Sequence, residues 1–155
     1  TQDMLAYAQS PDPNKRWYIN IDEAKRMGAE FDFKFKHDDK ISSYLNVTMQ
    51  NAKDDNDKRI SSIPKRIVNL GLDYNYDKWR AYIEGQYSSD RLDDGDIGGK
   101  LYSEDPFFIA NAGVSYKFMK NAVVSLAVRN LFDRDYWQWY KAPGRTWNVG
   151  VDFTF

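Results

Sequence analysis

The chain of 155 residues has no cysteine, a single histidine and no long apolar run. The absence of cysteine excludes a disulfide framework and a thiolate metal site. No segment approaches the roughly 20 consecutive apolar residues of a membrane-spanning helix. The formal net charge of −1 and the pI of about 5.8 lack the basic excess of a nucleic-acid-binding surface, so we expect no nucleic-acid partner.

Aromatic residues, in contrast, are abundant: they make up 16% of the sequence, with 11 Tyr and 5 Trp. The charged fraction of 29% and the mean hydropathy of −0.74 are typical of a soluble protein. The strands of a membrane barrel escape such averages, because only every second residue meets lipid. The length suffices for one domain.

The C-terminal residues 146–155 alternate strictly between apolar and polar side chains. A period of two indicates a half-buried β-strand. One face of this strand would carry Trp147, Val149, Val151, Phe153 and Phe155, and the other Thr146, Asn148, Gly150, Asp152 and Thr154. An apolar face with rings near both ends, opposite a face of small polar residues, is typical of a transmembrane barrel strand.

The same alternation recurs along the chain. We predict strands at 29–36, 41–51, 66–76, 79–89, 107–118, 122–131 and 146–155, with the first extended back towards Trp17 and the end of one more strand at 1–8. This gives about eight strands near the ~9–11 residues that a tilted membrane strand needs. The predicted fold is therefore all-β, with antiparallel up-and-down transmembrane strands.

Short and long connections alternate between these strands. Tight polar turns are predicted at 37–40, 75–78 and 119–121, and long polar loops at 9–16, 52–65, 90–106 and 132–145. Outer-membrane barrels have short periplasmic turns and longer extracellular loops, so the last strand would end on the periplasmic side. Since about eight strands can close into a small barrel, a self-contained eight-stranded barrel is the alternative architecture.

Three sequence motifs point to a known family. The first is N-L-F-D-x-x-Y at 130–136, followed by P-G-R at 143–145 and the alternating last strand. The second is N-x-x-x-A with G-x-E at 20–30, and the third is I-P-x-(basic) at 63–66. Together they resemble the C-terminal part of TonB-dependent outer-membrane receptors, and this resemblance extends along nearly the whole chain.

The resemblance implies that residues 1–155 are a C-terminal barrel segment, about the last third of a barrel of roughly 22 strands with a plug inside it. It places the chain in the outer membrane of a Gram-negative bacterium. Implied partners are outer-membrane lipid, the receptor's own plug and remaining strands, the TonB complex through the missing N-terminal part, the barrel-assembly machinery and a metal-chelate ligand. Without plug and TonB-binding segment, the chain alone could not perform energised transport.

The two ends of the sequence carry further expectations. The chain starts at Thr1 without a basic-then-apolar leader, although an exported protein is made with a signal peptide. We therefore expect a processed protein or a fragment truncated at Thr1, with Phe155 as the natural terminus. The resemblance also implies that the aromatic last strand, with Trp147, Val151, Phe153 and Phe155, is the signal for barrel assembly, read by strand pairing.

The last long loop holds the best ligand-contact candidates, Tyr136, Trp137, Trp139 and Tyr140, with Lys141 and Arg145 beside them. Aromatic faces and cations suit a large, planar, often anionic metal chelate. The alternative is an aromatic girdle where strands leave the bilayer. At the ends of this loop, Asn130 and Asp133 suit a strand-to-loop junction, and Gly144 supplies a backbone conformation that other residues resist.

Charged side chains on the polar faces of the strands form another group, because lipid would reject them. We expect the lumen- or plug-facing set to be Glu30, Arg80, Glu84, Lys117, Arg129 and Asp152, together with Asp32, Lys34 and Lys36. The acidic run 90–96 could suggest a calcium site, but it lacks the spacing and the closing Glu of an EF-hand. We expect this run and the charged run 53–59 to be solvated loops, with no metal site.

Catalysis has little support, because His37 is predicted to lie in a tight turn without a nucleophile or metal-binding cluster. We expect neither an enzyme nor a cofactor. Three functions remain: part of a receptor importing an iron–siderophore or similar chelate, a small barrel with a structural or adhesive role, or a small outer-membrane enzyme.

Overall fold

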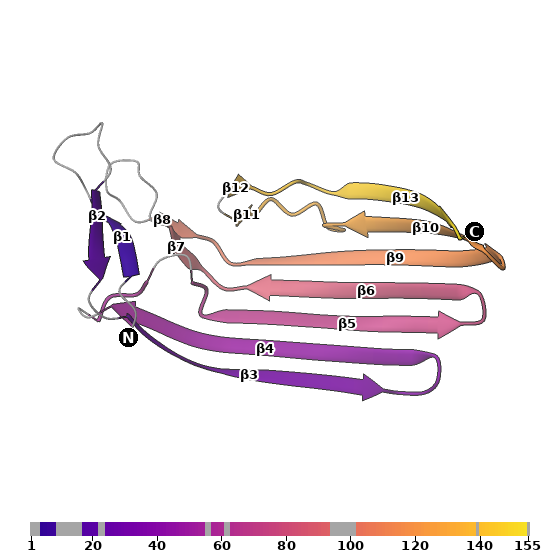
Figure 1. The fold of residues 1–155 in the computed structure, drawn as a ribbon, viewed down its shortest axis with the longest axis horizontal. Coiled ribbons are helices and arrows are strands. Elements are labelled where there is room, and N and C mark those ends of the chain that lie inside the picture. Colours follow the sequence, from indigo (N-terminus) through magenta and orange to yellow (C-terminus); the bar gives the residue numbers. More distant parts are fainter. Residues whose placement is uncertain are drawn as a thin grey trace.

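The computed structural model describes residues 4–8, 17–21, 24–54, 57–60, 63–93, 102–138 and 140–154. Its centre is one antiparallel sheet of seven strands in the order β13-β10-β9-β6-β5-β4-β3 (Figure 1). These strands are β3 (Ala24–Lys36), β4 (Ile41–Asp54), β5 (Arg66–Tyr76), β6 (Trp79–Ser88), β9 (Phe107–Met119), β10 (Ala122–Arg129) and β13 (Thr146–Phe153). The predicted all-β, up-and-down architecture is confirmed.

The N-terminal region differs from the prediction. β1 (Met4–Ala8) pairs with β2 (Trp17–Ile21) in a separate two-stranded sheet, so β1 adds no eighth strand and β2 is no extension of β3. The two segments are close in sequence, and closing a short loop costs little entropy. In the described part of the chain, β13 and β3 form the two edges of an open sheet, so the alternative closed eight-stranded barrel is not formed.

The short and long connections lie at opposite ends of the sheet (Figure 1). The short turns 37–40, 77–78 and 120–121 gather at the end where the C-terminus lies. In the first, the carboxylate of Asp38 accepts hydrogen bonds from the backbone N–H groups of Lys40 and Ile41, both at 2.7 Å, and these lower its pKa. In the second, Asp77 has a φ of 52°, which Asp tolerates better than most residues.

The long connections contain structure that the sequence did not predict. β4 continues to Asp54, and two small hairpins form within the later loops. One pairs β7 (Arg91–Asp93) with β8 (Tyr102–Glu104), and the other pairs β11 (Trp137–Gln138) with β12 (Tyr140–Lys141). The predicted loop at 9–16 lies outside the described residues.

Strand pairing separates an apolar from a polar face, as the alternation predicted. One row of paired residues is Phe33, Leu45, Leu70, Gly85 and Ala110, and the next row is Asp32, Asn46, Asn69, Gln86 and Ile109. A slip of one residue in any pair would exchange the two faces. The register is therefore fixed by the sequence pattern of each strand.

The apolar face is largely exposed and carries a band of aromatic rings near the short turns. Tyr76, Trp79 and Tyr116 share one row, with the rings of Trp79 and Tyr116 centred 4.5 Å apart. Phe118 and Phe153 make an edge contact at 6.4 Å. Such a band is typical of the membrane–water interface of a barrel. No helix among the described residues is both long and apolar enough to cross a membrane.

On the polar face, tyrosine rings lie over glycines of the neighbouring strand. A Cβ atom at Gly71 would be 2.3 Å from the ring of Tyr44, and one at Gly113 would be 2.4 Å from the ring of Tyr82. Each glycine is the direct partner of its tyrosine in the pairing register. Glycine is required here because any side chain would displace the ring.

Candidate functional site at the loop end of the sheet

Asn130 organises the start of the last long loop. Its side chain is buried, with 4% exposed, and its φ is 51°. Its Oδ1 accepts a hydrogen bond from the N–H of Arg134 at 2.9 Å, while its Nδ2 donates to the carbonyls of Arg134 at 2.8 Å and Pro143 at 3.4 Å. One amide side chain thus holds both ends of the loop.

Asp133 makes a second clasp between the same two ends. Its Oδ1 accepts a hydrogen bond from the N–H of Arg145 at 2.7 Å. A Cβ atom on Gly144 would lie 2.8 Å from that carboxylate oxygen, so Gly144 allows the close approach. The guanidinium of Arg145 donates to the carbonyl of Leu131 at 3.3 Å. The N-L-F-D and P-G-R motifs are therefore two halves of one loop base.

The loop base is attached to the polar face of the sheet. Oδ1 of Asn111 accepts from the N–H of Asn130, and Nδ2 of Asn111 donates to Glu84, both at 2.9 Å. The N–H of Leu131 donates to the carbonyl of Ala110 at 2.7 Å. Glu84, a carboxylate predicted to face the lumen, is thus linked through two hydrogen bonds to the base of the last long loop.

The structure places the predicted ligand-contact residues in different environments. The ring of Tyr136 packs on Phe107 at 4.6 Å, and Phe107 is only 4% exposed. Trp137 is 56% exposed, whereas Arg145 is engaged with the loop base. Trp139 and the side chain of Tyr140 lie outside the described residues. Of the described candidates, only Trp137 has an aromatic face that is largely open.

Three of the long loops contain described residues, and we number them first (52–65), second (90–106) and third (132–145). Arg91 joins the second of these loops to the third. Its guanidinium, about 10% exposed, forms an ion pair with Glu104 across the β7–β8 hairpin. It also donates a hydrogen bond to the carbonyl of Trp137 at 3.0 Å. A charged group with so little exposure requires such partners, so Arg91 fixes the backbone that carries Trp137.

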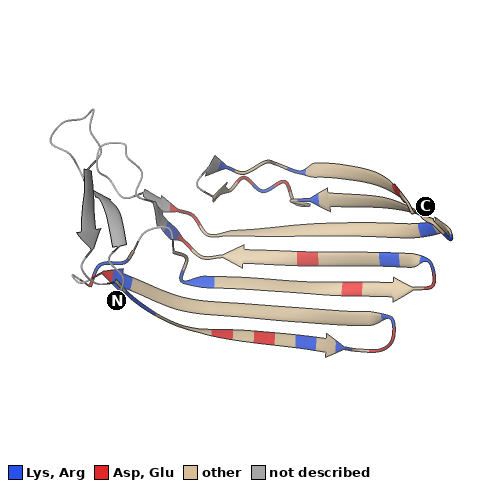
Figure 2. Ribbon diagram, viewed as in Figure 1, with Lys and Arg blue, Asp and Glu red and all other residues tan. Residues whose placement is uncertain are grey.

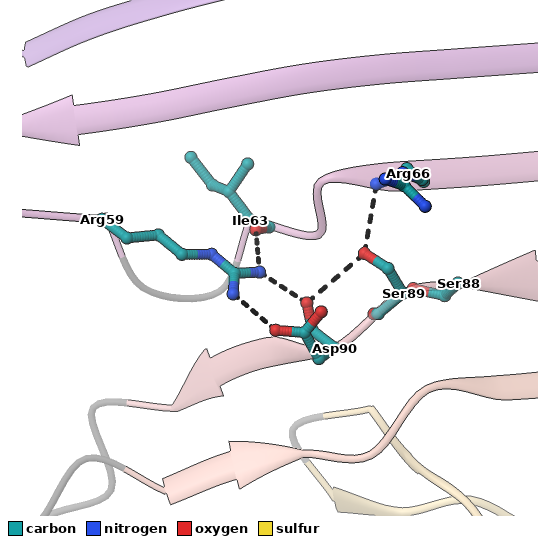
Figure 3. Close-up of polar contacts among 6 residues, drawn as sticks. All are labelled: Arg59, Ile63, Arg66, Ser88, Ser89 and Asp90. Carbon is teal, nitrogen blue, oxygen red and sulfur yellow. Dashed lines mark hydrogen bonds and ion pairs between the residues drawn. The ribbon is translucent and has the colours of Figure 1, made fainter.

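Arg59 joins the first long loop to the second (Figure 3). Its guanidinium contacts the carboxylate of Asp90 at 2.6 Å, the carbonyl of Asp90 at 2.5 Å and that of Ile63 at 3.2 Å. The hydrogen bond from Arg59 lowers the pKa of Asp90. Asp90 directly precedes Arg91, so Arg59, Asp90 and Arg91 connect all three described long loops.

This three-residue linkage was not predicted from the sequence. Asp90 and Arg59 were placed in two solvated charged runs, at 90–96 and 53–59. The pairing is between loops that are distant in sequence, and no local pattern reports it. The available signal was one arginine in each loop, Arg59 within 52–65 and Arg91 next to Asp90 at the start of 90–106.

The charges predicted to face a lumen lie along the strands of the sheet (Figure 2). The register places Glu30, Arg80, Glu84, Lys117, Arg129 and Asp152 on the polar face together. Asp32 accepts a hydrogen bond from Asn46 on the neighbouring strand. Within the described part of the chain, no group of three or more His, Asp or Glu side chains could hold a metal ion.

The C-terminal strand presents its apolar face at the sheet edge. Trp147, Val151 and Phe153 are 62%, 53% and 54% exposed, and β13 pairs only with β10 among the described strands. Phe155 lies outside the described residues. The role of these residues in barrel assembly stays a prediction.

Comparison with known proteins extends these observations. The family model for the TonB dependent receptor-like β-barrel matches residues 1–131. An iron-regulated outer membrane virulence protein of Vibrio cholerae serotype O1 is 25% identical over 146 residues, which cover 88% of this chain and 22% of that protein. The chain therefore spans about a fifth of the length of this relative.

Two solved structures share the fold. The copper transporter OprC superposes with a TM-score of 0.82 at 20% identity, covering 99% of this chain and 27% of that one. Pseudomonas aeruginosa FpvA, bound to a heterologous pyoverdine, gives a TM-score of 0.78 at 14% identity, covering 97% and 23%. With the family match over most of its length, the chain belongs to the TonB-dependent receptor β-barrel family of the Gram-negative outer membrane.

Proposed function

We propose that this chain supplies barrel wall, extracellular loops and the C-terminal assembly strand to a TonB-dependent receptor that imports an iron–siderophore or a similar large metal chelate. Family membership supports the receptor class. The Vibrio cholerae relative is named for iron regulation, and one solved neighbour holds a pyoverdine. The plug, the remaining strands and the TonB complex are the proposed partners of the whole receptor.

The observation that carries this proposal is the joined loop cluster at one end of the sheet. Arg59, Asp90 and Arg91 connect three loops, and Arg91 holds the backbone of the exposed Trp137. An aromatic face on a fixed backbone suits stacking on a planar chelate, and fixing a loop in advance reduces the entropy lost on binding. We infer that the third loop contributes to the ligand site.

The polar face suits the inside of the barrel. Its charges have mixed signs, and lipid would reject them, so we assign this face to a wet lumen and to plug contacts. The short turns are then periplasmic and the long loops extracellular.

We infer no enzymatic role for the chain. His37 lies in a short turn, where its Nε2 is 2.8 Å from Oγ of Ser43 and its ring stacks on Phe35. A catalytic His–Ser pair also needs a third group that orients the histidine, and among the described residues no side chain hydrogen-bonds the other ring nitrogen of His37.

The test uses the full-length receptor in a Gram-negative strain without its own siderophore receptors. We expect uptake of at least one radiolabelled ferric siderophore from a panel, and we expect its loss when TonB is deleted. Trp137→Ala should weaken binding of that chelate at least tenfold, since stacking on an aromatic face is lost.

Phe132→Ala is the matched control, because Phe132 is also an exposed aromatic residue of the third loop, at 66%. This variant should bind within about twofold of the wild type. Failure to transport any chelate of the panel would contradict the proposed import. Equal losses in both variants would contradict the assignment to Trp137.

A further inference from the structure

One row of the polar face joins four strands of the sheet to the base of the third loop. The row consists of Tyr44 on β4, Gly71 on β5, Glu84 on β6 and Asn111 on β9, each the direct partner of the next. From Asn111 a hydrogen bond continues to the backbone of Asn130, where the third loop is anchored. The row is therefore a continuous polar path from the middle of the wall to the loop.

Gly71 allows the side chain of Tyr44 to cross β5. A Cβ atom at Gly71 would be 2.9 Å from the hydroxyl oxygen of Tyr44. The strands β4 and β6 lie on either side of β5, about 10 Å apart at ~4.8 Å per strand. The Tyr44 hydroxyl nevertheless hydrogen-bonds with Glu84 on β6. The ring thus connects two strands that are not neighbours in the sheet.

Glu84 is held in this row by hydrogen bonds alone. Its carboxylate accepts from Nδ2 of Asn111 at 2.9 Å and contacts the hydroxyl of Tyr44. In the part of the chain that the structure describes, no lysine or arginine forms an ion pair with Glu84. The residue is half-buried, and a carboxylate in such a position needs donors close to it. Tyr44 and Asn111 supply them.

The amide of Asn111 has one possible orientation. The backbone N–H of Asn130 can only donate, so the Asn111 atom at 2.9 Å must be the carbonyl oxygen. The carboxylate of Glu84 can only accept, so the other contact of the amide must be its NH₂ group. Asn130 is only 4% exposed, and a buried N–H that loses its acceptor is costly. The position of Asn130 therefore depends on Asn111, and that of Asn111 on Glu84.

We propose that Tyr44, Glu84 and Asn111 are positioning residues for the third loop. They lie outside the loop, on the face assigned to the lumen, and act through Asn130, whose side chain holds both ends of the loop. A change at Glu84 would therefore move the loop that carries Trp137 without touching a bound chelate. That this loop contacts a chelate rests on the proposed function, whereas the hydrogen-bonded row can be tested without it.

The test follows the mobility of a spin label at Phe132, an exposed residue of the third loop, in the full-length receptor without any chelate. Asn111→Asp keeps an acceptor for the N–H of Asn130 but replaces the donor to Glu84 by a second carboxylate. Near pH 9, where carboxylates are ionised, the two groups repel each other. The correlation time of the label should then shorten about twofold, because the loop base loses a fixed partner.

The double variant Asn111→Asp/Glu84→Gln distinguishes positioning from a general structural effect. Its new amide can donate to the new carboxylate and still accept from the Tyr44 hydroxyl, so both contacts of the row are restored with exchanged polarity. The label at Phe132 should return to its wild-type correlation time. A second label at Leu126, on the apolar face of β10, should keep its mobility in every variant.

Tyr82 supplies the matched control for Tyr44. Its ring lies over Gly113 in the same way, in the next row towards the short turns, and its hydroxyl forms no hydrogen bond with the described residues. Tyr44→Phe should shorten the correlation time at Phe132, whereas Tyr82→Phe should leave it unchanged.

Three outcomes would each overturn the proposal: a double variant that does not restore the label, equal effects of the two tyrosine variants, or a parallel change at Leu126. Because no chelate takes part, a receptor that imports no siderophore can still confirm or overturn the positioning role. Conversely, unchanged mobility in Asn111→Asp would overturn this role and leave the proposed import intact.

Discussion

Single residues set how closely the strands and loops approach each other. Gly71 lies beneath the ring of Tyr44, and Gly144 lies beside the carboxylate of Asp133. Asn130 and Asp133 both have positive φ angles, of 51° and 54°, a region that Asn and Asp enter more readily than other side chains. Residue type at these positions is therefore dictated by geometry, independently of any contact with a ligand.

The first prediction at this scale concerns Gly71. In the full-length receptor, Gly71→Ala should lower the free energy of unfolding by about 1–3 kcal/mol, because the new methyl group displaces the Tyr44 ring. The measurement is urea unfolding in lipid vesicles, followed by tryptophan fluorescence. In the background of Tyr44→Ala the same change should cost much less, and an equal cost in both backgrounds would contradict the contact.

Elements of the fold differ in how well the sequence predicts them. The ends of β5, β6 and β9 were predicted to within one residue, because the alternation of apolar and polar residues is local. The pairing of β1 with β2, the two loop hairpins and the Arg59–Asp90 contact were missed. These depend on contacts across loops that carry no periodic signal. The motif residues Asn130 and Asp133 were placed at a junction, but their hydrogen-bond partners Asn111 and Arg145 required the structure.

The link between the first two loops should depend on pH. The pKa of Asp90 is lowered from its ordinary value of 3.8, chiefly by the hydrogen bond from Arg59. The stabilisation of the folded loops by ionised Asp90 is therefore complete above pH ~4. It is lost as the pH falls through the lowered pKa of Asp90. Because the Asp90 side chain is 45% exposed, we expect a contribution of about 1 kcal/mol or less.

The measurement is the mobility of a spin label at Lys58 in the full-length receptor. Mobility should rise in Asp90→Asn at pH 7, and wild type and variant should converge as the pH falls through the lowered pKa of Asp90. Asp135→Asn is the control, because the Asp135–Lys141 pair is exposed and lies in the third loop. A difference between wild type and Asp90→Asn that does not shrink as the pH falls would exclude the ionic link.

The whole molecule is organised by its two faces and its two ends. The apolar face leaves large side chains such as Val149 exposed, at 76%, and lipid would remove this area from water. The polar face carries most of the charged residues in the middle of the sheet strands, among them Glu30, Arg80, Glu84 and Asp152. Both edges of the sheet, β13 and β3, have unpaired backbone groups in the described part of the chain, which lipid penalises. The two edges of the sheet are therefore suited to pairing with further barrel strands.

Spin labels on the full-length receptor in vesicles test this assignment of faces. Labels at Leu126 and Val151, which lie on the apolar face, should relax faster when oxygen is dissolved in the lipid. Labels at Arg129 and Asp152, on the polar face of the same two strands, should relax faster when a water-soluble nickel chelate is added. The opposite pattern would reverse the inside and the outside of the barrel.

The separation of short turns from long loops has a consequence for how such a receptor can change during evolution. An insertion at the loop end lengthens a surface segment, which adds little entropy cost, and leaves every strand pair unchanged. A one-residue insertion within a strand would exchange the two faces of that strand. The same exchange would follow if a shortened turn forced the next strand to pair one residue out of register. Mutations that alter ligand preference can therefore accumulate at one end of the molecule while the other end and the wall remain compatible with the same membrane.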